Sequence, residues 1–200
     1  MLIAPGQLAL QRAEQYGLTY DEFLQQWELE VQTHRRAGSK VQGESDPLRL
    51  NLARTLRIQK TYVPPEALLQ RLAALPPQRW IVITEPWCGD SAQFLPPLAR
   101  LAESQPHITL RILRRDQHLD LMDLFLTNGK RSIPKLIALD PEGNVLFTWG
   151  PRPTKIHQRF LEERAKGVPK EELLKQLQQW YKEDQFQSFH QDLLALLETL

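Results

Sequence analysis

Apolar residues recur at helical spacing through the first third of the chain. Two stripes follow the four-residue spacing of an amphipathic helix, namely Phe23, Trp27 and Val31, then Leu48, Leu52 and Leu56. Thr19 with Glu22 forms a capping-box pattern before the first stripe, and Asp46-Pro47 is a helix-start signal before the second. We therefore expect residues 1–60 to form a helical N-terminal extension, with a loop over residues 38–45.

Short apolar runs alternate with helical stretches from residue 61 to residue 166. The runs predict strands over residues 79–84, 107–113, 135–140 and 144–149. The stretches predict helices over residues 89–104, 119–126 and 154–166, and an earlier helix that Pro64-Pro65 opens and that ends near Pro76-Pro77. Because the run Trp80–Ile83 is apolar throughout, we expect a central strand that is covered on both faces. The pattern predicts an α/β fold with a central mixed sheet flanked by helices.

Residues 167–200 carry two more helical stripes. The first consists of Leu173, Leu177, Trp180 and Tyr181, and the second of Phe189, Leu193, Leu196, Leu197 and Leu200. One interpretation is a C-terminal helical extension that packs on the same unit, and the other is a homodimer contact. We therefore divide the chain into an N-terminal extension (1–60), a central domain (61–166) and this C-terminal extension.

Composition and charge exclude several classes of partner. Of the 200 residues, 42% are hydrophobic and 24% are charged, which is typical of a globular protein. The net charge of +1 gives no reason to expect nucleic acid as a partner, and no apolar run is long enough to span a membrane. The five histidines show no metal-ligand spacing, so we expect no metal and no resident cofactor.

The single cysteine, Cys88, follows the apolar run and precedes a helical pattern. A lone cysteine forms no internal disulfide, which favours a reducing, cytoplasmic compartment. A thiol at a strand-to-helix junction lies over the unpaired N–H groups of the helix, where the helix dipole favours the thiolate. We therefore expect Cys88 to be more acidic than a free thiol and to act as a nucleophile.

Three neighbouring side chains bear on this chemistry. Ser91 should lie within hydrogen-bond reach of Cys88 across the first helical turn and favour its ionisation. Asp90 has two interpretations, a proton acceptor for the thiol or a residue that suits the helix start. Glu85 is expected to be exposed. We count Cys88, Ser91 and Asp90 as candidate catalytic residues.

The motif Trp87-Cys88-Gly89-Asp90-Ser91 resembles the W-C-G-x-C motif of the thioredoxin superfamily, with serine in place of the second cysteine. Pro96 matches the helix-kinking proline of that family, and Ser132-Ile133-Pro134 resembles its cis-proline loop. The resemblance covers roughly residues 62–166. It implies a thioredoxin-like fold without its first strand, of which Thr61–Val63 would be a remnant. The family's buried acid falls on Val82 here.

The resemblance also implies a substrate groove beside the cysteine. Its candidate residues are Trp87, Gly89, Ile133, Pro134 and Arg131. Arg131 and Lys130 have two interpretations, as cations that face Cys88 or as solvated loop charges. The basic side of the helix over 47–60 likewise reads as a solvated face or as an anion-attracting rim near Cys88.

The function that follows is a single-thiol disulfide exchanger. Cys88 would attack a disulfide of a protein or small molecule, and an external low-molecular-weight thiol would resolve the mixed disulfide. The Cys-Gly-Asp-Ser site is also similar to the Cys-Gly-Phe-Ser site of monothiol glutaredoxins, which can hold an iron–sulfur cluster with glutathione. The alternative from another class is a non-catalytic thioredoxin-like binding module.

Overall fold

The computed structural model describes residues 3–36 and 46–200. Its N-terminal part consists of α1 (Pro5–Tyr16), α2 (Tyr20–Arg36) and α3 (Pro47–Thr61). Thr19 and Glu22 exchange hydrogen bonds at the start of α2, and Asp46 accepts the N–H of Leu48 at the start of α3. Both helices therefore start at the signals read from the sequence. The loop expected over 38–45 lies outside the described residues.

A four-stranded sheet forms the centre of the molecule. Its strands are β1 (Gln78–Thr84), β2 (Ile108–Arg114), β3 (Lys135–Leu139) and β4 (Val145–Trp149). The spatial order is β2-β1-β3-β4, with β1 parallel to β2 and the other two pairs antiparallel. The predicted α/β fold with a central mixed sheet is confirmed.

Hydrophobic cores lie on both faces of the sheet because successive side chains of a strand point to opposite faces. Trp80 and Val82 belong to one core, together with α5 (Gly89–Glu103) and α2. Ile81 and Ile83 belong to the other, which is covered by α1 and the short α6 (Leu119–Met122). The sheet is thus enclosed between helices, as its all-apolar central strand requires.

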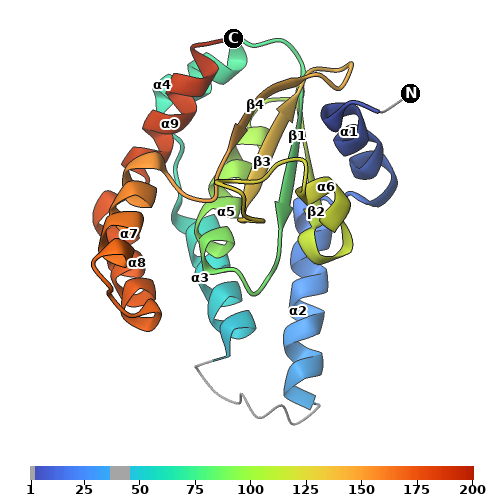
Figure 1. Cartoon of the computed structure of the whole chain (residues 1–200). Coiled ribbons are helices and arrows are strands. Elements are labelled where there is room, and N and C mark those ends of the chain that lie inside the picture. Colours follow the sequence, from blue (N-terminus) through green and yellow to red (C-terminus); the bar gives the residue numbers. More distant parts are fainter. Residues whose placement is uncertain (1–2, 37–45) are drawn as a thin grey trace.

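The remaining helices are α4 (Glu66–Ala73), α7 (Thr154–Ala165), α8 (Lys170–Asp184) and α9 (Gln187–Leu197), with a 3-10 turn η1 (Arg115–Gln117) after β2. The last three helices gather at the left of Figure 1. Most of their apolar stripe residues are buried in the chain's own core. A homodimer through these helices stays a prediction, and it would have to use exposed side chains such as Leu174 and Leu200.

Two predicted elements differ from the structure. Thr61 is the last residue of α3 and residues 62–65 form no strand, so the prediction of a remnant first strand is wrong. The exposed edge of β2 is instead met by Leu18, which exchanges two backbone hydrogen bonds with Ile112. The helix predicted over 119–126 ends at Met122. After Met122 the backbone forms turns with hydrogen bonds between residues i and i+3, and Phe125 is buried in the core.

Candidate functional site

Cys88 lies at the carboxyl end of β1 and is the N-cap residue of α5. Its thiol is partly buried and donates a hydrogen bond to the carbonyl oxygen of Ile133 at 3.3 Å. The Ile133–Pro134 peptide bond is cis. The cysteine and the loop of Pro134 are 46 residues apart in the sequence, yet the fold brings them into contact because β1 and β3 are neighbours.

A cavity of about 330 Å³ opens beside the thiol. Of the candidate residues, Trp87, Cys88, Asp90, Arg131 and Ile133 line it. The others lie around it in different ways. Ser91 is buried beneath the thiol, Pro134 follows the lining residue Ile133, and Gly89 faces α3 and α8 instead.

The thiol itself is not acidic. Burial raises the pKa of Cys88 from 9.0 to about 11, and the carboxylate of Asp90 adds to this rise. Hydrogen bonds from the Ser91 hydroxyl and from the N–H groups of Ser91 and Asp90 act in the opposite direction, but they do not offset the loss of water. The expectation of a thiol more acidic than a free one is therefore wrong.

Ser91 belongs to a short chain of hydroxyls below the cysteine. Thr84, the last residue of β1, donates its hydroxyl hydrogen to Ser91 Oγ at 2.5 Å. The Ser91 hydroxyl is then free to donate its own hydrogen to the sulfur, and this contact lowers the pKa of Cys88. Two buried hydroxyls are thus aligned toward the thiol.

Asp90 holds two segments of the chain together. Its carboxylate pairs with Arg152 at 2.8 Å and accepts a hydrogen bond from the Tyr181 hydroxyl at 2.7 Å. Tyr181 lies on α8, so the C-terminal extension contacts the first turn of α5 directly. Because both oxygens are engaged, Asp90 is more than a solvated residue at the helix start.

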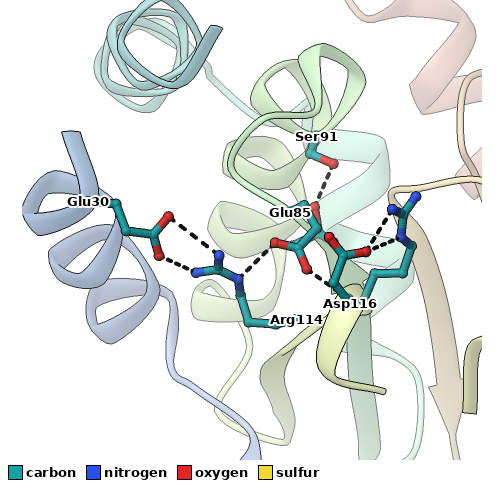
Figure 2. A network of polar contacts seen from close by, with 7 residues as sticks. Glu30, Glu85, Ser91, Arg114 and Asp116 are labelled. Carbon is teal, nitrogen blue, oxygen red and sulfur yellow. Dashed lines mark hydrogen bonds and ion pairs between the residues drawn. The ribbon is translucent and has the colours of Figure 1, made fainter. Parts of the chain in front are cut away.

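Glu85 is buried, which corrects the expectation that it would be exposed. Its carboxylate is 2% exposed, pairs with Arg114 at 2.9 Å and accepts the N–H of Asp116 at 2.9 Å. Figure 2 shows the Arg114 guanidinium between the carboxylates of Glu85 and Glu30. No local pattern marks this burial, because a glutamate that closely follows a buried strand is expected in a loop. The network fixes the segment that leads to Cys88.

Cations surround the cavity. Arg131 is engaged with Asp123 at 2.6 Å, and Arg115 lies 4.7 Å from the centre of the Trp87 ring. Lys130 and Arg164 also line the cavity, and neither pairs with a carboxylate there within the described part of the chain. The site is therefore cationic, although Arg131, Arg115 and Arg152 are each already paired with a carboxylate.

Sequence reasoning missed the residues that come from distant segments. Arg152 follows a Gly-Pro pair after β4, and Tyr181 was read only as part of an apolar stripe. His157 on α7 lines the cavity as well, and no partner for either buried ring nitrogen is found among the described residues. No local pattern marks these side chains, because they reach the site only through the packing of α7 and α8.

In residues 3–36 and 46–200, no three or more His, Cys, Asp and Glu side chains gather in a way that would hold a metal ion. Over the same residues no helix is both long and apolar enough to cross a membrane.

Comparisons with known proteins bear on the family. No curated protein matches the chain. Among solved structures, a protein of unknown function from Pseudomonas aeruginosa is similar over 99% of both chains, with a TM-score of 0.61 and 21% identity. An HIV epitope scaffold is similar over 93% of this chain and 95% of its own, with a TM-score of 0.60 and 20% identity. Both likenesses show the fold alone. The family model described as thioredoxin matches residues 40–166, and the chain therefore belongs to the thioredoxin family.

Proposed function

We propose that the protein is a monothiol thiol–disulfide oxidoreductase. The observation that supports this most is the position of Cys88, at the N-cap of α5, against the carbonyl of Ile133 and beside an open cavity. A disulfide in that cavity would meet the sulfur and the backbone of the Pro134 loop together. The mechanism uses a single thiol and an external reductant, which fits a reducing, cytoplasmic compartment.

The reaction proceeds in two exchanges. The Cys88 thiol loses its proton, and the thiolate attacks one sulfur of a disulfide to form a mixed disulfide. The second substrate sulfur leaves as a thiolate and takes up a proton. Because Ser91 holds the place of a second cysteine, a low-molecular-weight thiol then attacks the mixed disulfide. It frees Cys88 and forms a new disulfide with the bound sulfur. One external thiol is consumed and one substrate thiol is released, so the net reaction replaces one half of the substrate disulfide by the external thiol.

The cations of the cavity favour substrates with carboxylates. Lys130 and Arg164 line it without a carboxylate partner among the described residues, and Arg152 is already paired with Asp90. An acidic peptide disulfide or a carboxylated small thiol would be attracted to this rim. Trp87, which is 42% exposed, offers an apolar contact at its edge.

The raised pKa of Cys88 favours the second candidate, a non-catalytic thioredoxin-like binding module. A pKa of about 11 in place of 9.0 leaves about a hundredfold less thiolate at neutral pH. The thiolate that remains is intrinsically more nucleophilic, which recovers about six- to tenfold. The net rate is then about tenfold below that of an ordinary thiol, so exchange is slowed but not prevented.

Mixed-disulfide trapping tests the proposal. We expect the full chain, incubated with an excess of glutathione disulfide, to gain the mass of one glutathionyl group at Cys88, and added reduced glutathione to remove it. Cys88→Ser should abolish the adduct. An absence of adduct from wild-type protein, although an alkylating probe modifies Cys88, would favour the binding module instead.

The variants of Ser91 provide matched controls. Ser91→Ala should slow adduct formation, because a hydrogen bond to a charged group contributes about 1.5 to 3 kcal/mol. Ser91→Cys should release the substrate and leave an internal disulfide, since the new thiol lies within the first turn of α5. If Ser91→Ala reacts as fast as wild type, the hydroxyl does not support the thiolate.

A further inference from the structure

A second and larger cavity lies away from the thiol, between α3 and α8. Its volume is about 780 Å³, within the range of small-molecule sites. Each helix contributes one face at i, i+3, i+4 and i+7 spacing, which are residues 54, 57, 58 and 61 on α3 and residues 175, 178, 179 and 182 on α8. The cavity is therefore a cleft between two aligned helix faces.

All charged residues that line this cleft are basic. Its lining includes Arg54, Arg57, Lys175 and Lys182 and no Asp or Glu. Within residues 3–36 and 46–200, none of the four cations forms an ion pair. The α3 helix carries no acidic residue at all. Four cations that face one another without a counter-charge repel, unless an anion lies between them.

Two carboxylates lie near the cleft without lining it. Glu183 on α8 accepts a hydrogen bond from the lining residue Gln179, and Asp184 accepts bonds from Ser188. Burial, together with the neighbouring Arg57, lowers the pKa of Arg54, which is the expected effect of a cation placed among like charges. Neither of these carboxylates forms an ion pair with Arg54, Arg57, Lys175 or Lys182.

A neutral hydrogen-bonding group also lines the cleft. Gln93 of α5 lines the cavity with 8% of its surface exposed, so its side-chain amide lies at the wall of the cleft. Gly89 lies at the same side, since a Cβ built there would be 3.9 Å from Arg54 Nη1.

The lip of the cleft is strained. Gln185 and Phe186, which join α8 to α9, have φ values of 48° and 65° and both line the cavity. Positive φ is uncommon for residues other than glycine, and such strain gathers at ligand-binding segments. The two residues close the side of the cleft between the helix faces.

We propose that this cleft is a binding site for a small molecule that carries two or more phosphate groups. Arginine matches phosphate oxygens with two parallel N–H bonds, and lysine adds point charges. Arg54 and Arg57 on one wall and Lys175 and Lys182 on the other would hold the anionic groups between them. The amides of Gln93 and Gln178 would donate to the remaining oxygens. The site is separate from the cavity of Cys88, and the bond between Tyr181 and Asp90 lies between the two.

The test is isothermal titration calorimetry of the full chain with inorganic tripolyphosphate. We expect binding that weakens as salt is raised, because the contacts are ionic. The double variant Arg54→Gln with Lys182→Gln should lose at least about tenfold in affinity, equivalent to about 1.4 kcal/mol. The matched control is Arg49→Gln with Lys60→Gln. It also removes two positive charges, but from positions of α3 that do not line the cleft. It should bind within about twofold of wild type.

Three results with tripolyphosphate would overturn the proposal. The first is no binding of tripolyphosphate by wild-type protein. The second is equal loss in the control and cleft variants, which would show that only net charge matters. The third is loss in Lys130→Gln with Arg164→Gln, which would place the anion beside Cys88. Cys88→Ser should retain binding, so this test and that of the proposed exchange reaction fail separately. Citrate should bind more weakly, and equal binding would contradict the choice of phosphate.

Discussion

Asp90→Asn should make Cys88 more acidic and the protein less stable. The Asp90 carboxylate adds to the raised pKa of Cys88, and it also pairs with Arg152. Asparagine keeps an oxygen that accepts the hydrogen bond of Tyr181 but removes the charge. The same substitution therefore acts on the thiol and on the fold in opposite directions.

The magnitudes follow from the burial of the pair. The side chains of Arg152 and Asp90 are only 14% and 9% exposed, and breaking a buried ion pair costs about 3 to 5 kcal/mol. Removal of this negative charge should lower the pKa of Cys88. Each tenfold gain in thiolate comes with a thiolate about threefold less nucleophilic, so exchange at neutral pH should become about threefold faster for each such gain.

The assay combines a thiolate absorbance titration, urea unfolding and the rate of reaction with a small disulfide. Asp120→Asn is the matched control, because Asp120 is 57% exposed and pairs with Arg12 on the surface. It should change stability by less than about 1 kcal/mol and leave the thiol as it is. An Asp90→Asn protein with an unchanged pKa of Cys88, or with unchanged stability, would refute this reasoning.

Further outcomes are expected from pH and from two other positions. Folding raises the pKa of Cys88 from 9.0 to about 11, so its contribution to stability is present below pH 9 and is lost as pH rises toward 11. In urea unfolding, the free energy of unfolding of Cys88→Ala should therefore decline less steeply between these pH values than that of wild type. Glu85→Gln should cost about 3 kcal/mol in urea unfolding because it leaves buried Arg114 with one carboxylate fewer, whereas Glu30→Gln, at a position 37% exposed, should cost less. Gly150→Ala should lower the melting temperature in calorimetry, since the φ of Gly150 is +111° and a Cβ would lie 2.1 Å from the carbonyl oxygen of Pro134. The strain of such a residue is about 1 to 3 kcal/mol. An unchanged melting temperature would contradict this geometry.

Much of the fold could be predicted from local pattern. The capping box at Thr19, the start signal at Asp46-Pro47 and the apolar run Trp80–Ile83 each specify an element through short-range physics. The helix after Cys88 begins where the motif places it. Predictions of elements were wrong where tertiary packing decides the local structure, as in the turns after Met122 that bury Phe125.

The site was harder to predict because its chemistry depends on burial. The position of Cys88 at a helix start predicted a low pKa. That prediction holds only for a thiol that stays exposed to solvent. Here desolvation is the larger effect. The partners of Asp90, which are Arg152 and Tyr181, come from segments 62 and 91 residues further along the chain. No periodicity in one sequence reveals such contacts.

The central claim is that Cys88 is a nucleophile toward disulfides despite its raised pKa. The most direct measurement is the rate of mixed-disulfide formation with glutathione disulfide, followed by intact mass from neutral to alkaline pH. We expect one glutathionyl adduct at Cys88, with a rate that rises continuously toward a pKa of about 11. The account is contradicted if no adduct forms at any pH at which the protein stays folded, while a small alkylating probe still modifies Cys88.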